Sequence, residues 1–310
     1  PWLDVSVGAW VAASTSVAVL LLLQIRLYRF VPVALLLLLP VFFPAAVRPT
    51  YGAARLLVFD VGQGLSVLVQ TQHHTLLYDT GPGYASGFNT GEAVIVPYLR
   101  YSGIRTVDKL VLSHGDMDHR GGVDAVLESL DVTELVTNVP VPGRETTPCL
   151  AGTSWVWDAV SFNIIHPISP SDYADGNNTS CVLTISTQGA TAMLPGDIEW
   201  QAELQLALRT ANTELGQDPL AADVLIMPHH GSKTSSSPGF LDRVNPAVAI
   251  ASVGYLNRFH HPYTDVVDRY QSRGVTLLTT ALLGSIVVDL GVKGELELDN
   301  WRMQHRYYWN

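Results

Sequence analysis

Positive charge and cysteine are both scarce in this chain of 310 residues. It has 18 lysines and arginines against 28 aspartates and glutamates, and only two cysteines. Free-standing DNA-binding domains are usually basic, because contacts to phosphates provide most of their affinity. The composition therefore argues against a domain that holds nucleic acid by charge alone. Two cysteines are also too few for a zinc ribbon or a disulfide scaffold.

The two cysteines, Cys149 and Cys181, leave two interpretations open. In an oxidising compartment they can form one bridge, which closes a loop of about 30 residues. Otherwise they are two buried thiols. The sequence favours neither interpretation.

Charge of either sign is rare in the first 50 residues. An apolar run at 5–24 has about the length that crosses a bilayer, and a second run, interrupted by prolines, covers 30–47. We expect a transmembrane helical hairpin here, since a signal peptide needs a charged start and a small-residue cleavage site, and neither is present. The chain begins with Pro1 rather than methionine, so we expect a fragment or a processed product.

The soluble part is expected outside the cytoplasmic (inner) membrane. Arg26 and Arg29 lie between the two apolar runs and favour a cytoplasmic loop, which would place residues 51–310 on the extracytoplasmic side. Arg48 and Arg55 on the other flank weaken this inference.

The soluble part is also more acidic than the whole chain. Without Asp4, Arg26, Arg29 and Arg48, residues 51–310 hold 27 acids against 15 bases, a net charge of about −12. Bound metal cations would offset part of this charge.

Short β-branched runs and helical patterns alternate after residue 50. Strands are predicted at 55–61, 66–70, 75–79, 109–113, 160–165, 181–186, 191–195, 222–227, 247–252, 275–280 and 285–290. Helices are predicted at about 90–101, 122–130, 198–211 and 263–273. This order indicates two sheets with helices outside. Residues 138–158 are rich in proline and are expected to form a surface loop.

The stretch SHGDMDHRGG at 113–122 follows a predicted strand and is dense in metal-binding side chains. It offers the imidazoles and carboxylates of His114, Asp116, Asp118 and His119. Mixed nitrogen and oxygen ligands suit a divalent transition metal. The alternative is a polar, solvated loop with a helix-capping aspartate, but two histidines and two aspartates before paired glycines favour the metal.

One loop cannot complete a metal site, so partners are expected at the ends of other strands, where ligand sites of layered sheets gather. Asp197 is predicted to bridge two metals, although it could instead cap the following helix. His229 is predicted as a ligand, although His229 and His230 could also be a surface pair. Asp79 is expected to hold a ligand histidine or the metal loop in place.

Several motifs together resemble one family. They are DVGQG (60–64), LLYDTGP (76–82), SHGDMDHRGG (113–122), NNTSCVL (177–183), LPGDIE (194–199), MPHHGSKTSS (227–236) and FHHP (259–262). In this order they resemble the C-terminal metallo-β-lactamase-like domain of the ComEC family of DNA-internalisation (competence) proteins. The resemblance implies an α/β (α+β) fold, the αββα sandwich, at 51–292, after the end of a membrane channel domain at 1–50 and before a tail at 293–310.

The chain departs from the wider superfamily at two places. Asp116 replaces the second histidine of the usual HxHxDH pattern, and residues 177–180 stand where a further metal histidine is usual. Asn178 and Ser180 are therefore expected to support ligands rather than bind metal. The first metal position is rich in oxygen, which makes Mn²⁺ as plausible as Zn²⁺ for one or two ions.

The resemblance implies a metal-dependent nuclease that degrades the DNA strand not carried into the cell. The expected metal ligands are His114, Asp116, Asp118, His119, Asp197 and His229. The expected catalytic residues are Asp118, His230 and His261, with His230 or His261 contacting the scissile phosphate or protonating the leaving oxygen. Expected partners are DNA, the membrane, the rest of the uptake channel and its DNA receptor, with no dinucleotide cofactor.

Other interpretations stay open. Lys233, Thr234 and Ser235 could contact the DNA backbone or form an ordinary polar loop. The terminal HRYYW at 305–309 could stack on bases, although a packing tail is the preferred interpretation. The fold could hydrolyse a β-lactam, a lactone or a small phosphodiester instead. A domain that only guides DNA or gates the channel would also fit the acidic balance.

Overall fold

The structure is a computed structural model that describes residues 13–20, 32–33, 35–36, 48–169, 176–210, 218–294 and 296–300. The predicted hairpin falls largely outside these residues, as does most of the predicted tail. Among the described helices, none is long and apolar enough to cross a membrane. The chain divides into two compact units, residues 1–47 with 101–103 and residues 48–100 with 104–310. The second unit carries every predicted site residue.

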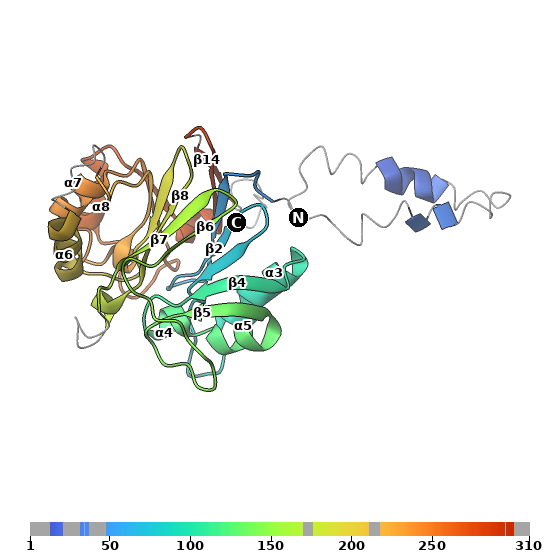
Figure 1. Cartoon of the computed structure of the whole chain (residues 1–310), viewed down its shortest axis with the longest axis horizontal. Helices are drawn as coiled ribbons and strands as arrows, with labels where there is room; N and C mark the ends of the chain where they lie inside the picture. Colours follow the sequence, from blue (N-terminus) through green and yellow to red (C-terminus); the bar gives the residue numbers. More distant parts are fainter. Residues whose placement is uncertain are drawn as a thin grey trace. The chain divides into compact units, whose positions relative to one another are not determined.

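Two seven-stranded sheets form the centre of the second unit (Figure 1). The first sheet has the order β14 (Leu296–Asn300), β13 (Ile286–Leu290), β1 (Ala54–Val58), β2 (Val67–Gln70), β3 (Thr75–Tyr78), β4 (Thr106–Val111) and β5 (Asp131–Val136). The second has the order β12 (Thr276–Thr279), β11 (Val248–Ala251), β10 (Val224–Ile226), β9 (Thr191–Leu194), β8 (Val182–Ser186), β7 (Val160–His166) and β6 (Ser154–Trp157).

Both sheets are mixed. The strands β3, β4 and β5 run parallel, as do β9, β10, β11 and β12, and the other described pairs are antiparallel. The carboxyl ends of parallel strands meet at one edge of a sheet. Each sheet therefore brings several strand ends, and the loops that follow them, to one edge.

Helices cover the outer face of each sheet. Beside the first sheet lie the π-helix η2 (Gly91–Ile95) and the helices α3 (Val96–Tyr101) and α5 (Val123–Ser129), whereas the short helix α4 (Met117–Arg120) carries Asp118 and His119. Beside the second lie α6 (Trp200–Thr210), α7 (Pro238–Val244) and α8 (Thr264–Gln271), which Figure 1 shows on the far side from α5. Short turns at η3 (Asn177–Thr179), η4 (Pro228–Gly231) and α9 (Thr280–Leu283) complete the described elements of the second unit.

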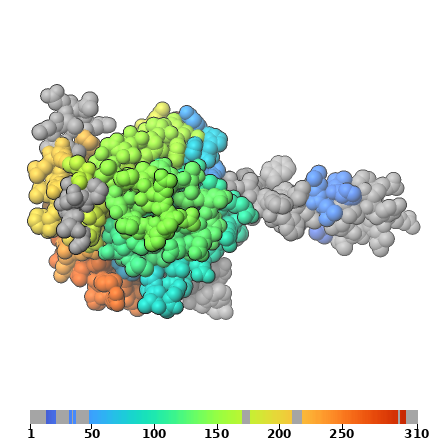
Figure 2. Space-filling view, turned by 60° about the horizontal axis from the view of Figure 1, so that its bottom comes forward, coloured from blue at the N-terminus to red at the C-terminus, as the bar shows by residue number. Residues whose placement is uncertain are grey.

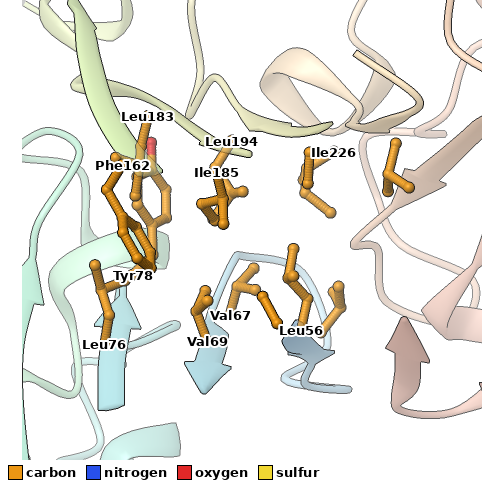
Figure 3. Packing of buried hydrophobic residues seen from close by; sticks show 14 of the residues in the cluster. Leu56, Val67, Val69, Leu76, Tyr78, Phe162, Leu183, Ile185, Leu194 and Ile226 are labelled. Carbon is orange, nitrogen blue, oxygen red and sulfur yellow. The ribbon is translucent and has the colours of Figure 1, made fainter. Parts of the chain in front are cut away.

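Side chains that point alternately to the two faces of each strand form separate apolar layers on the two sides of each sheet. On β1, Leu56 and Val58 face the second sheet, whereas Leu57 faces the helices, because successive side chains point to opposite faces of a strand. The inward residues of both sheets form one apolar layer, in which Tyr78 lies opposite Phe162 (Figure 3). Two further apolar clusters fill the spaces between each sheet and its helices. The result is the four-layer αββα sandwich that the sequence predicts.

Every predicted strand overlaps an observed one, but three observed strands were missed. β5 carries Asp131 and Glu134, and β14 reads LELDN, so neither shows a clean apolar run. β6 lies inside residues 138–158, where the prolines predict a loop. It is an edge strand of its sheet, paired on one side only, and its Trp155 and Trp157 pack against the layer between the sheets. In the space-filling view, the green segments around it lie at the surface (Figure 2).

The two cysteines are joined. Cys149 and Cys181 form a disulfide that is buried between the sheets. The backbone amide of Cys181 donates to the Ser113 carbonyl at 2.9 Å, and the Tyr78 hydroxyl donates to the Cys181 carbonyl at 2.6 Å. The bridge therefore lies directly beneath the loop that begins at Ser113.

We expect Leu56→Ala to lower the free energy of unfolding by about 2–5 kcal/mol, because it leaves a cavity in the layer between the sheets. Leu56 is 0% exposed, whereas Val156 on the edge strand β6 is 64% exposed. The matched change Val156→Ala should cost less than about 0.5 kcal/mol. Urea denaturation followed by circular dichroism measures both, and equal losses would contradict this assignment of the core.

Candidate metal centre

The metal loop is held by close backbone contacts that glycine makes possible. Gly64 has a φ of +143°, and a Cβ there would collide with the Asp118 carbonyl. That carbonyl accepts a hydrogen bond from the Leu65 amide at 3.1 Å. At the other end of the loop, Gly121 packs against the backbone of Gly83 with no room for a side chain. The DVGQG and DTGPG segments thus fix both ends of the histidine–aspartate loop.

Four side chains from three strand ends converge on one point. Asp118 and His119 follow β4, Asp197 follows β9 and His230 follows β10, and one ligand atom of each lies within 4.8 Å of the others. Nε2 of His119 is 3.0 Å from an Asp197 oxygen and 3.2 Å from Nε2 of His230. Nε2 of His230 is 3.4 Å from an Asp118 oxygen. Two imidazoles and two carboxylates are a donor set that suits a divalent metal.

In both cluster histidines, His119 and His230, the Nδ1 atom already makes a hydrogen bond. Nδ1 of His119 donates to the buried Asp79 carboxylate at 2.7 Å. Nδ1 of His230 donates to the Ser252 carbonyl at 2.9 Å. A ring nitrogen that donates in this way fixes the tautomer and leaves the opposite nitrogen free to bind metal. Both Nε2 atoms are therefore oriented as ligands.

Electrostatics favour a cation at this point. Burial alone would raise the pKa of the Asp197 carboxyl, but the charges of His119 and His230 lower it well below its usual range. Burial alone would lower the pKa of His119, but Asp197 and Asp79 raise it well above its usual value. Burial also opposes ionisation of Asp118, yet its hydrogen bond to His230 and the charge of His119 lower its pKa to about 2. The carboxylates stay ionised and attract positive charge, which a divalent cation would supply in place of a proton.

A second position adjoins the cluster. His114 is completely buried, its ring lies 4.3 Å from that of His119, and its Nε2 has no hydrogen-bond partner among the described residues. The nearest carboxylate oxygen belongs to Asp116, at 3.6 Å. Nδ1 of His114 lies 2.9 Å from the Ser113 hydroxyl and 3.4 Å from that of Ser180. A buried, unpartnered imidazole nitrogen beside a carboxylate fits a further metal ligand.

The cluster contains His230 and not His229, which the sequence suggests as the ligand. His230 lies in the cluster, while the His229 ring is 22% exposed and its Nδ1 is 3.3 Å from Glu199. Its Nε2 is 3.8 Å from Asp197. Both residues have a left-handed backbone, with φ of 48° and 55°, and their ring planes lie at 66° to each other. Local sequence does not reveal this geometry, because positive φ is uncommon in residues other than glycine.

The supporting residues lie near the cluster. Asp79 accepts hydrogen bonds from the Ser113 amide and hydroxyl, each at 2.7 Å. The Ser180 hydroxyl accepts a hydrogen bond from the Asp197 amide at 3.0 Å. The Asn178 side chain accepts one from the Glu199 amide at 2.9 Å. These contacts position the segment that carries Asp197.

The remaining predicted residues lie farther out. The His261 ring is 6.5 Å from that of His230, and burial and the neighbouring histidines lower its pKa to about 4. Lys233 is exposed and its ammonium lies over the Tyr263 ring. Thr234 donates to Glu199 at 2.8 Å. Ser235 is buried and donates to the Pro228 carbonyl, so it braces the turn and does not face solvent.

Sequence reasoning missed three contributors. Ser113 links Asp79 to His114, and its place directly before the first histidine was the available signal. Glu199 contacts His229, two residues beyond Asp197. The Ser252 carbonyl orients His230, and a backbone acceptor leaves no signal in the sequence.

The comparisons with known proteins agree with this geometry. The profile of the Metallo-beta-lactamase superfamily matches residues 59–143, which include Asp79 and the whole metal loop. The chain is 39% identical over 256 residues to Competence protein ComA of Neisseria gonorrhoeae, which covers 83% of this chain and 35% of that protein. It is 37% identical to Recombination protein 2 of Haemophilus influenzae (78% and 29%) and 32% identical to ComE operon protein 3 of Bacillus subtilis (74% and 32%).

The chain thus carries a metallo-beta-lactamase domain. The resemblance to ComEC-family competence proteins is confirmed by these relatives. The chain spans about a third of the length of the curated relatives that it matches.

We expect Asp79→Asn to weaken metal binding by about 10- to 100-fold, because His119 loses the carboxylate that orients it. Asp124→Asn, on the exposed side of α5, is the matched control and should leave binding unchanged. Isothermal titration with Zn²⁺ and Mn²⁺ measures both affinities. Equal affinities in the two variants would show that Asp79 does not support the centre.

The two adjacent histidines offer a second test. His230→Ala removes a cluster imidazole and should lower the metal content after dialysis, whereas His229→Ala should retain most of it. Elemental analysis of the dialysed proteins gives the result. A larger loss in His229→Ala would restore the ligand set expected from the sequence.

Proposed function

We propose that this chain is the hydrolase domain of a DNA-uptake channel, and that it cleaves phosphodiester bonds in the DNA strand that is not carried into the cell. The observation that carries the proposal is the cluster of Asp118, His119, Asp197 and His230, with both Nε2 atoms directed inward. The name of one relative, Competence protein ComA, supports a role in DNA uptake.

A divalent metal, Mn²⁺ or Zn²⁺, would be held by the four cluster residues and, at the adjoining position, by His114 and Asp116. When bound, such an ion supplies Lewis acidity and lowers the pKa of a water molecule. Asp118 is the cluster carboxylate most open to solvent, with a side chain 35% exposed, so it is placed to accept the proton of the attacking water.

The outer histidines would contact the substrate. Nε2 of His230 faces the cluster, which leaves His261 and His229 to contact the scissile phosphate or the leaving oxygen. With a pKa of about 4, His261 is neutral at pH 7 and acts as a hydrogen-bond donor rather than as a cation. Lys233 and Thr234 are both exposed near these histidines and would contact the DNA backbone.

We further propose that the hydrolase domain, residues 51–292, lies outside the cytoplasmic membrane. The proposed anchor is the apolar segment 1–50, the end of a membrane channel. Of the segment 293–310 that the sequence predicts as a tail, residues 296–300 form β14 of the first sheet. The Cys149–Cys181 disulfide supports this location, because disulfides persist in oxidising compartments. The partners would then be DNA, the membrane, the rest of the channel and its DNA receptor.

The proposal predicts metal-dependent cleavage of DNA. Asp118→Ala and Asp197→Ala should each lower the rate by at least about 100-fold, since each removes a ligand of the centre. His73→Ala, whose side chain is 68% exposed and bonds Asp158, should cleave normally. Release of acid-soluble nucleotides by the 310-residue chain, with EDTA or with Mn²⁺, measures the effect.

Two outcomes would contradict the nuclease proposal. Hydrolysis of nitrocefin or a lactone without cleavage of DNA would indicate a small-molecule hydrolase on the same fold. A folded, metal-loaded protein with no hydrolytic activity would indicate a domain that guides DNA or gates the channel. The position at His114 and Asp116, where a carboxylate replaces the usual histidine, is the feature that would explain a domain without hydrolytic activity.

A further inference from the structure

We propose that the loop at 254–261 is a platform on which unpaired bases stack beside the metal centre, so that the centre selects single-stranded DNA. The inference rests on the proposed nuclease function and names the form of its substrate. The loop follows β11 and reads GYLNRFHH. It exposes Tyr255 at 70%, Leu256 at 85% and Phe259 at 42%.

The loop is braced from within by Asn257. Its side-chain amide donates to the carbonyls of Gly254, at 3.1 Å, and His261, at 2.7 Å. Its side-chain oxygen accepts a hydrogen bond from the His261 amide at 2.9 Å. The exposed aromatic side chains are therefore presented on a fixed backbone, which lowers the entropic cost of binding.

Stacked rings connect the loop to the centre. The Phe259 and His261 rings are 5.7 Å apart at 26°, and the His261 and His230 rings are 6.5 Å apart at 23°. His230 in turn contacts Asp118. The series thus runs from an exposed aromatic side chain to a residue of the metal cluster.

The base of the loop also touches the segment beneath the metal loop. A Cβ at Gly254 would lie 3.0 Å from the Gln63 amide, so the two backbones are in close contact there. Gly64, the next residue of that segment, packs on the Asp118 carbonyl. The platform and the centre are therefore neighbours through the backbone as well as through the rings.

The charge balance favours stacking over phosphate contacts. Residues 51–310 carry 27 acids against 15 bases, so an extended basic groove is not available in this sequence. At this edge, however, two cations lie on aromatic rings, Arg258 over Phe259 at 4.7 Å and Lys233 over Tyr263 at 4.6 Å. Base stacking on aromatic side chains binds single strands without sequence preference, and paired bases do not offer their faces. The occupant that fits is a single strand, with bases on the exposed Tyr255 ring and on the Phe259 ring, where a base would replace Arg258, and with phosphates near the two cations.

Binding of a short fluorescein-labelled oligodeoxythymidylate to the 310-residue chain tests the platform. EDTA prevents cleavage, and fluorescence anisotropy gives the affinity. Wild-type protein should bind this strand at least about 10-fold more tightly than a duplex or an abasic strand of the same length. The double change Tyr255→Ala with Phe259→Ala should remove the preference for bases. The Tyr255→Phe single variant should keep it.

The matched control is Tyr51→Ala, which removes an aromatic side chain that is 64% exposed and lies before β1. It should bind like wild type, and circular dichroism verifies that each variant is folded. Equal binding of the abasic strand, the duplex and the oligodeoxythymidylate by wild-type protein would overturn the inference. So would a double variant that keeps the preference for bases.

A membrane role for the loop is a further outcome that would overturn the proposal. In that case the double variant would lose binding to anionic phosphatidylglycerol vesicles and keep its binding of the oligonucleotide. Because binding is measured without metal, failure of the platform is distinguishable from failure of the nuclease proposal, which the cleavage assay decides.

Discussion

The buried carboxylate of Asp79 joins the fold to the candidate centre. It lies at the end of β3, is completely buried, and accepts hydrogen bonds from the Ser113 amide, the Ser113 hydroxyl and Nδ1 of His119. A buried charge is tolerated only when it is fully hydrogen-bonded. The three donors satisfy it, and in doing so they fix the first residue of the metal loop and one of its ligands. The position of the loop relative to the first sheet depends on this group.

The second sheet contributes two further hydrogen bonds. The hydroxyl of Ser180, next to the Cys149–Cys181 disulfide, accepts a hydrogen bond from the Asp197 amide. The Ser252 carbonyl, after β11, accepts one from His230 and orients its ring. The candidate centre is thus assembled beside the strand ends of both sheets, with ligands from both. His119, Asp197 and His230 are each held by a residue from the same sheet's half of the fold, namely Asp79, Ser180 and Ser252.

The alternation of apolar residues along the strands made most of the fold predictable from the sequence. The density of metal-binding side chains made part of the site predictable. Alternating apolar residues mark β1 and its neighbours, whereas the charged edge strands β5 and β14 gave no such pattern, because an edge strand is only half covered. The density of histidine and aspartate at 114–119 pointed to a metal loop. The choice between His229 and His230 depended on two left-handed residues and a backbone carbonyl, which no local pattern encodes.

The ligands of the cluster are spread widely along the chain, with Asp118 and His119 in the first sheet's half and Asp197 and His230 in the second's. During synthesis, amino-terminal segments emerge and fold first. A chain that has formed only β1 to β5 therefore holds half of a binding site, and the first sheet itself is finished only when β13 and β14 have been made. The four side chains can meet only after synthesis has passed His230. A product truncated before His230 would lack one imidazole of the cluster and would hold a divalent cation less tightly.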